Sequence, residues 1–163
     1  MPTATVLLMA SVVLGPRDAL TGVWHNSTCV GSGYSELYAF FPDGSFRWQE
    51  NQMDGVAPVR VRWGNWALDH DCLVLSVDSV KVWEGGHLEP AECSVGTDSM
   101  LVDFEERVIP LSPPETLTVD IARLRLDLCD ENEDLPADVW GVDLDGSRFW
   151  RIASDPAEID RML

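Results

Sequence analysis

Few residues of this sequence are suited to chemistry, and they are widely spaced. His70 stands between aspartates and His87 follows two glycines, so we expect both in solvated loops. His25 follows a tryptophan in an expected strand and is the candidate catalytic acid or base. No CxxC pair occurs among the cysteines, which leaves one disulfide or four buried thiols as alternatives. They are Cys29, Cys72, Cys93 and Cys129.

Marked catalytic motifs are also absent from the chain. It has no GxSxG, no P-loop and no GxGxxG before a helix, which removes the best-marked hydrolase and nucleotide-binding classes. The acidic run "DENED" at 130–134 begins like a calcium loop, but Leu135 takes the place of the glycine and no glutamate closes the loop. We therefore expect no cofactor and no metal, and a solvated loop at this run.

Two alternating arginine pairs are the candidate anion anchors. Arg60 and Arg62 stand in one expected strand, and Arg123 and Arg125 stand in another. A guanidinium that faces a barrel interior could hold a carboxylate or phosphate in bidentate fashion. Alternation with valine and leucine instead favours arginines that face solvent, with the apolar side chains inward. Both orientations stay open, and the second is the simpler one.

The charge balance is strongly acidic. Eleven basic residues against 28 acidic ones give a formal charge of −17 at pH 7 and a pI near 4.2. Such a surface repels nucleic acid and anionic membranes, and it attracts cationic proteins. We expect no nucleic-acid partner. Solubility is the plainer explanation of the charge, and a cationic protein partner is the alternative.

Short strands separated by turns fill most of the chain. The segments 34–41 and 46–51 flank "PDGS", and a second hairpin over 139–152 turns at Asp145-Gly146. Further strands are expected at 58–68, 72–83, 100–109 and 115–128. The strand at 115–128 is expected to contain a bulge. Loops are expected at 84–99 and around Pro110, Pro113 and Pro114.

The two ends of the chain carry different signals. The apolar run 6–14 resembles the core of a signal peptide, but no basic residue precedes it and no A-x-A site follows. It is too short to span a bilayer, so we expect no membrane span. We expect 1–19 to form a leading strand or plug. We also expect a cytoplasmic protein, or a secreted one if 1–15 is a cleaved signal. At the other end, Asp155 and Pro156 predict the start of a short closing helix.

These elements predict an all-β fold of eight or nine strands, either a sandwich or an up-and-down barrel. Seven tryptophans favour the barrel, because bulky aromatic side chains close barrel ends and line cavities. We predict one domain over 1–163, a single antiparallel up-and-down β-barrel. The barrel occupies 20–152, and a C-terminal helix lies within 153–163.

Two tryptophan motifs carry a family resemblance. "LTGVW" at 20–24 and "GNWALDHDCLVLSV" at 64–77 resemble the bacterial lipocalin-like branch of the calycin superfamily. The resemblance implies that Gly22 and Trp24 open the first strand and that the indole closes one end of the barrel. The opening is similar to that of avidins as well. The Thr-Asp-Tyr segment of lipocalins and the later ligand pattern of avidins are absent, so neither secreted transport nor biotin binding is carried over.

Three functions follow as hypotheses. In the first, the barrel binds a small apolar or amphipathic molecule in an aromatic-lined cavity with one or two polar anchors. The residues expected to bind it are Tyr34, Tyr38, Trp48, Trp63 and Arg125. The second, implied by the resemblance, is a cofactor-independent cyclase or isomerase of a biosynthetic pathway that works by orientation and exclusion of water. The third is an acidic inhibitor or immunity-type protein that binds a cationic partner through a patch centred on 127–145.

Overall fold

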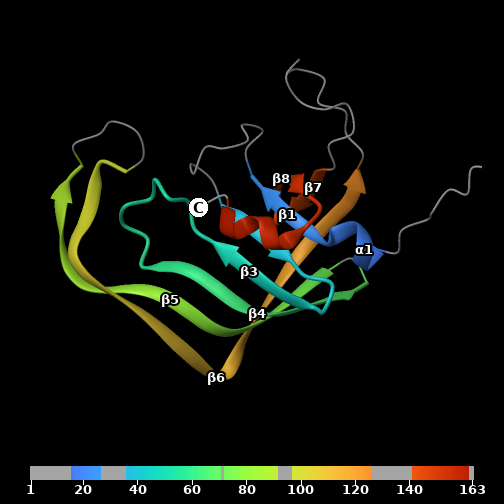
Figure 1. The fold of residues 1–163 in the computed structure, drawn as a ribbon, viewed down its shortest axis with the longest axis horizontal. Helices are drawn as coiled ribbons and strands as arrows, with labels where there is room; N and C mark the ends of the chain where they lie inside the picture. Colours follow the sequence, from blue (N-terminus) through green and yellow to red (C-terminus); the bar gives the residue numbers. More distant parts are fainter. Residues whose placement is uncertain (1–15, 27–35, 71, 92–96, 126–140, 162–163) are drawn as a thin grey trace, which may run out of the picture.

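The computed structural model describes residues 16–26, 36–70, 72–91, 97–125 and 141–161. Within them, eight antiparallel strands follow one another in chain order, and the last pairs with the first, so the sheet closes into a ring (Figure 1). The strands are β1 (Gly22–His25), β2 (Leu37–Phe40), β3 (Ser45–Gln49), β4 (Val59–Asp69), β5 (Cys72–Pro90), β6 (Ser99–Arg125), β7 (Gly141–Leu144) and β8 (Ser147–Ala153). This ring confirms the predicted all-β, antiparallel, up-and-down arrangement.

Two short helices flank the ring. An α-helix, α1 (Pro16–Leu20), precedes β1, and a 3-10 helix, η1 (Pro156–Arg161), follows β8. The Ala157 N–H donates to Asp155 Oδ1 over 2.9 Å, as an N-cap requires. The closing helix is therefore confirmed, with 3-10 geometry. At the other end, α1 overturns the leading-strand alternative for residues 16–19, while 1–15 lies outside the described residues.

The two predicted hairpin turns form at their Asp-Gly pairs. Between β2 and β3, Gly44 has a φ of 93°, and Asp43 Oδ1 accepts the Ser45 N–H over 2.8 Å. Between β7 and β8, Asp145 and Gly146 have φ values of 48° and 80°. Two successive positive φ values give the turn whose twist matches the flanking strands. The turns thereby fix the register of both hairpins.

The inner faces of the strands build one apolar core. In β3, Phe46 and Trp48 are buried and their neighbours are only half-buried, which is the alternation of a one-sided strand. At one end Trp24 is fully buried, and its Nε1 donates to the Leu20 carbonyl of α1 over 2.7 Å. Gly22 beside it has a φ of 136°, and a Cβ there would lie 2.5 Å from the Ala153 carbonyl oxygen. Only glycine fits that position.

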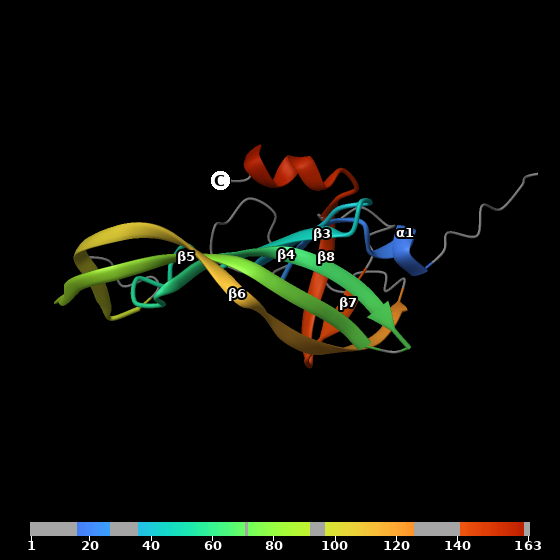
Figure 2. The same ribbon diagram turned by 90° about the horizontal axis from the view of Figure 1, so that it is seen from below.

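A second, smaller cluster lies on the outer face. Ile159 of η1 packs there with Val23, Leu37 and Ala39. Figure 2 shows η1 lying along one side of the sheet. The helix therefore covers β1 and β2 from outside, and it places the side chains of its last turn beside β3.

Strands β5 and β6 continue well beyond the ring. The last pair between β4 and β5 is Val59 with Val82, whereas β5 stays paired with β6 as far as Pro90 with Ser99. Both views show this two-stranded ribbon twisting away from the ring (Figures 1 and 2). We call the segments 79–90 and 99–110 the arm, counting as its base the residues 79–82, which still pair with β4.

The arm corrects two expectations about loops. Residues 84–90, expected in a loop, belong to β5, and the three prolines Pro110, Pro113 and Pro114 lie within β6. The prolines are accommodated by a large bulge, because Val77 pairs with Glu115 and Ser79 with Pro110, so that four residues of β6, 111–114, stand opposite the single Asp78 of β5. In this segment β5 is the only strand that pairs with β6 among the described residues, and prolines are tolerated on such an edge.

Candidate functional site

A row of cross-strand neighbours crosses the inner face of the ring. Trp24 pairs with Tyr38, Tyr38 with Trp48, and Trp48 with Arg62. The guanidinium carbon of Arg62 lies 4.2 Å from the Trp48 ring centroid, which is a cation–π contact. The row therefore brings a phenol and a cation together with two buried indoles.

The Tyr38 ring packs against two phenylalanines in this row. It stacks on Phe40 at 5.5 Å between centroids and meets Phe149 edge-on at 5.3 Å. Burial raises the pKa of the phenol, the negative charge of Glu36 raises it further, and Arg62 opposes the shift. Tyr38 thus stays neutral in the physiological range and can hydrogen-bond a ligand but not act as its base.

The structure reverses the simpler expectation for β4. Alternation favoured inward Val61 and Trp63 with outward arginines, yet Arg62 contacts core residue Trp48. Trp63 instead pairs with Arg47 on the outer face. The register of β4 against β5 shifts between Val59 and Val61, and such a bulge inverts the phase of the residues beyond it.

The other predicted site residues lie apart from this row. His25 is buried and pairs with Leu37 of the outer cluster, so strand alternation places it on the outer face. Arg125 pairs with Gly141 at the end of β6, but its side chain is outside the described part of the structure. Tyr34 and residues 127–140 of the predicted acidic patch are outside it as well.

A groove opens on the outer face of the sheet beside η1. Its volume is about 410 Å³. Its walls include Phe41, Trp63 and Ile159, and its polar groups include Arg47, Asp78 and Asp160. We call it the η1 groove. The groove thus offers apolar walls and one cation, Arg47, beside two carboxylates, and a ligand with an apolar body and an anionic group that reaches Arg47 would suit it.

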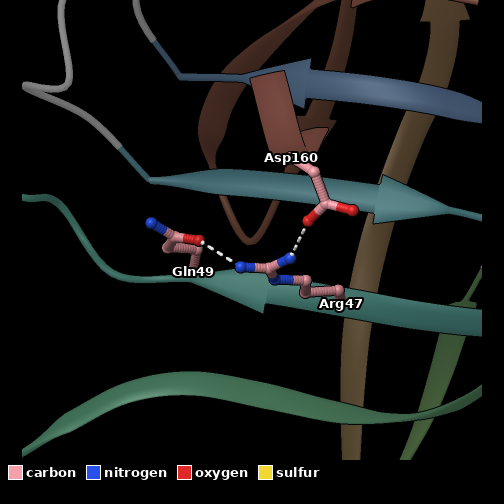
Figure 3. Close-up of polar contacts among 3 residues, drawn as sticks. All are labelled: Arg47, Gln49 and Asp160. Carbon is pink, nitrogen blue, oxygen red and sulfur yellow. Dashed lines mark hydrogen bonds and ion pairs between the residues drawn. The ribbon is translucent and has the colours of Figure 1, made fainter. Parts of the chain in front are cut away.

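Arg47 is held in place from two sides (Figure 3). Its Nη1 donates to Asp160 Oδ1 over 2.6 Å, and its Nη2 donates to Gln49 Oε1 over 3.1 Å. The Arg47 side chain is only 19% exposed, whereas that of Asp160 is 74% exposed. The Arg47 Nε is buried and has no hydrogen-bond acceptor among the described residues. A buried donor left unsatisfied costs about 1–3 kcal/mol, so this guanidinium has unused binding capacity.

A second groove, of about 230 Å³, lies on the other side of Arg47. It runs from β3 to the base of the arm, where Trp83 Nε1 donates to Glu106 Oε1 over 3.1 Å and Lys81 pairs with Glu106 at 2.6 Å. These two contacts, led by that of Lys81, lower the pKa of Glu106. Burial raises the pKa of Glu50, which lines the same groove. Arg47 thus borders both grooves.

Arg60 at the back of this second groove has a structural role. Its Nη1 donates to the Asp54 carbonyl over 2.6 Å and its Nη2 to the Asn51 carbonyl over 2.9 Å, and the guanidinium lies 4.2 Å from the Trp83 ring centroid. Burial lowers the pKa of Arg60. Arg60 therefore anchors the loop that precedes β4 to the base of the arm.

Sequence reasoning missed Arg47 and Asp160. The alternation of Phe46 and Trp48 does predict that Arg47 points outward. Its partner lies 113 residues later in the chain, on a helix whose docking position no local pattern specifies. The η1 groove could therefore not be found before the tertiary structure was known.

Two further properties bear on chemistry. Among the described residues, no group of three or more His, Cys, Asp or Glu side chains could hold a metal ion. In the same part of the chain, no helix combines the length and hydropathy needed to cross a membrane. No protein-family model, curated protein or solved structure matches the chain. A functional assignment therefore rests on the geometry of the two faces of the ring.

Proposed function

We propose that this protein binds a small amphipathic anion in the η1 groove, with Arg47 as the anchor for the anionic group. The observation that carries the proposal is the state of Arg47: a largely buried guanidinium with an unsatisfied Nε, set among apolar walls. A groove of about 410 Å³ lies in the range of small-molecule sites, which is roughly 300–1,000 Å³.

Apolar area and charge have separate roles in this binding. Trp63 and Phe41 offer aromatic surface for the apolar body of a ligand, and burial of such surface supplies affinity. Arg47 supplies orientation, because a guanidinium pairs with a carboxylate or sulfonate through more than one N–H. The Asp160 carboxylate occupies part of that guanidinium and competes with the ligand.

The inner row is a second candidate site for the same ligand class. Arg62 over Trp48, with the neutral phenol of Tyr38 beside it, supplies an anchor among aromatic rings. A cofactor-independent cyclase would use this interior, since it needs aromatic walls and excluded water more than a titratable group. The two sites are separated by variants at Arg47 and Arg62.

Titration with 1-anilinonaphthalene-8-sulfonate, an aromatic sulfonate whose fluorescence rises on burial, tests the η1 groove. Arg47→Gln removes the anchor and is expected to weaken binding at least tenfold. Asp160→Asn removes the competing carboxylate and is expected to strengthen it. Arg161→Gln is the matched control, because Arg161 lies on the same helix and pairs with Glu158 outside the groove. Its affinity should equal that of the wild type.

Each other outcome has a definite meaning, provided that circular dichroism shows every variant folded. Unchanged affinity in Arg47→Gln with a loss in Arg62→Gln would move the site to the inner row. Unchanged affinity in both variants would overturn the proposal that either arginine anchors an anion.

A further inference from the structure

The arm concentrates the exposed apolar surface of the described residues. Among them, five large hydrophobic side chains are exposed, and four lie on the arm: Leu88, Met100, Val108 and Ile109. The fifth, Val56, lies in the loop before β4, where the Leu101 N–H of the arm donates to the Gly55 carbonyl over 2.7 Å. Single exposed apolar residues are common, but their gathering on one element marks an interaction surface.

The arm also presents an unpaired strand edge. Residues 104–109 of β6 pair with β5 on one side in unbroken register, and no described strand pairs with them on the other. Before them the edge is interrupted at Asp103, which has a φ of 56° and no β5 partner in the register. An edge of this kind offers backbone N–H and C=O groups to an added strand. Pro110 ends the stretch, because proline has no N–H to donate. The accessible edge therefore has a defined length, from the interruption at Asp103 to Pro110, enough for a strand of about six residues.

The charge on the arm selects the partner. The arm carries five carboxylates. Two of them form ion pairs with a lysine or arginine, Glu84 with Arg107 and Glu106 with Lys81, and Glu89 and Asp103 lie 3.1 and 3.8 Å from the ring nitrogens of His87. Among the described residues, Glu89, Asp103 and Glu105 have no lysine or arginine partner. A second copy of this chain would bring the same negative charge against them, and like charges across an interface cost affinity. A cationic segment gains from every one of them.

We propose that the arm docks a cationic polypeptide segment that adds as an extended strand along residues 104–109 of β6. Val108 and Ile109 lie on opposite faces of β6, so the apolar side chains on one face of the segment cover Val108. On the other face its lysines or arginines meet Glu105, and their aliphatic stems cover Ile109. Pairing with the edge supplies backbone hydrogen bonds, and the exposed apolar residues supply the apolar contact. This surface shares no residue with the lining of the η1 groove, so it can fail or hold independently of the anion site.

The test uses a fluorescent ten-residue peptide of alternating lysine and valine, added to the full chain at low salt. A peptide of alternating lysine and serine, with equal charge, is the control. We expect the first peptide to bind at least tenfold more tightly by anisotropy, to weaken as salt is raised, and to slow amide hydrogen exchange within 104–109. Equal binding of both peptides, or protection elsewhere in the chain, would overturn the proposal.

Variants place the peptide on the arm. Val108→Ser with Ile109→Ser should weaken the lysine–valine peptide at least tenfold, and Glu105→Gln should weaken it about threefold. Asp69→Asn, at an exposed carboxylate outside the arm, is the charge control and should leave binding unchanged. Unchanged binding in the double variant would refute the site. A wild-type dimer that the double variant abolishes, seen by sedimentation, would replace the cationic partner with a second copy.

Discussion

Strands β5 and β6 have two different environments along their length, and the comparison separates stability from binding. In the ring, β5 alternates between buried and half-buried residues from Cys72 to Val77; in the arm, every β5 residue from Glu84 to Pro90 is exposed. Leu75 is 2% exposed and Leu88 is 61% exposed, although both are leucines of one strand. The ring gives each strand two neighbours and a common core, whereas beyond Val82 the arm gives β5 only β6. Apolar residues in the arm therefore add little to folding and remain available to a partner.

Glycines show the same contrast. In the ring, a Cβ at Gly64 would overlap the Ser76 carbonyl oxygen of the adjacent strand, so glycine permits the close approach of β4 and β5. In the arm, Gly85 has a φ of 75° and no atom within 4 Å of its ideal Cβ. Space is the constraint at the first position, and backbone conformation is the constraint at the second.

The largest expected difference is between Leu75→Ala and Leu88→Ala. Truncation of a buried leucine leaves a cavity, so Leu75→Ala should lower the free energy of unfolding by about 2–5 kcal/mol. Leu88→Ala should change it by less than about 0.5 kcal/mol. Urea denaturation followed by tryptophan fluorescence measures both. Equal losses would mean that the arm belongs to the cooperative core, and the contrast would be lost.

A smaller difference is expected between Gly64→Ala and Gly85→Ala. The first forces two paired strands apart, at a cost of about 3 kcal/mol. The second places alanine in the left-handed region, which costs about 1–2 kcal/mol. The decrease in melting temperature relative to the wild type, measured for both variants, shows which substitution costs more. A larger loss for Gly85→Ala would show that the backbone conformation of the arm at Gly85, and not the approach of β4 to β5, limits stability.

The smallest expected effect lies where ring and arm meet, at Glu50. Burial raises the pKa of this carboxyl, so between its ordinary and raised pKa the folded protein binds more protons than the unfolded chain. The contribution of Glu50 to the free energy of unfolding therefore falls as the pH rises through that window. The window begins at the ordinary glutamate pKa, near 4.3.

Glu50→Gln removes this dependence and retains an oxygen for the Asn51 N–H, which now donates to Glu50 Oε1 over 2.8 Å. The variant should have the same melting temperature as the wild type at pH 4 and a slightly higher one at pH 7. The gain in free energy of unfolding at pH 7 should be less than about 0.5 kcal/mol, because the site is partly exposed. Thermal melts at both pH values give the comparison. An identical offset at pH 4 and pH 7 would contradict the assigned cause.

Local signals in the sequence predicted the ring well. The Asp-Gly pairs at Asp43-Gly44 and Asp145-Gly146 set both tight hairpins, because their φ requirements are local. The bulged strand predicted over 115–128 is confirmed as far as Arg125, where the register against β7 shifts. Gly22 and Trp24 occupy the first strand as expected, with the indole buried against α1.

The orientation of β4 and the length of β6 could not be predicted. The arginines of β4 alternate with valines and Trp63, and either set suits a half-buried face, so the bulge near Arg60 decides which set faces inward. Three prolines in β6 argue against a strand when neighbours are unknown, yet an edge position tolerates them. In both cases the deciding contact is with a strand that local sequence does not specify.

The sequence by itself determined the all-β class, the order of the hairpins, the acidic charge and the glycine positions, because each depends on a residue and its near neighbours along the chain. Only the tertiary structure decided which face of β4 meets the core, that η1 brings Asp160 to Arg47, and that β5 and β6 leave the ring as an exposed arm. Those features depend on pairings between segments far apart in the chain. Those pairings stabilise the protein only when the strands have come together in the closed ring.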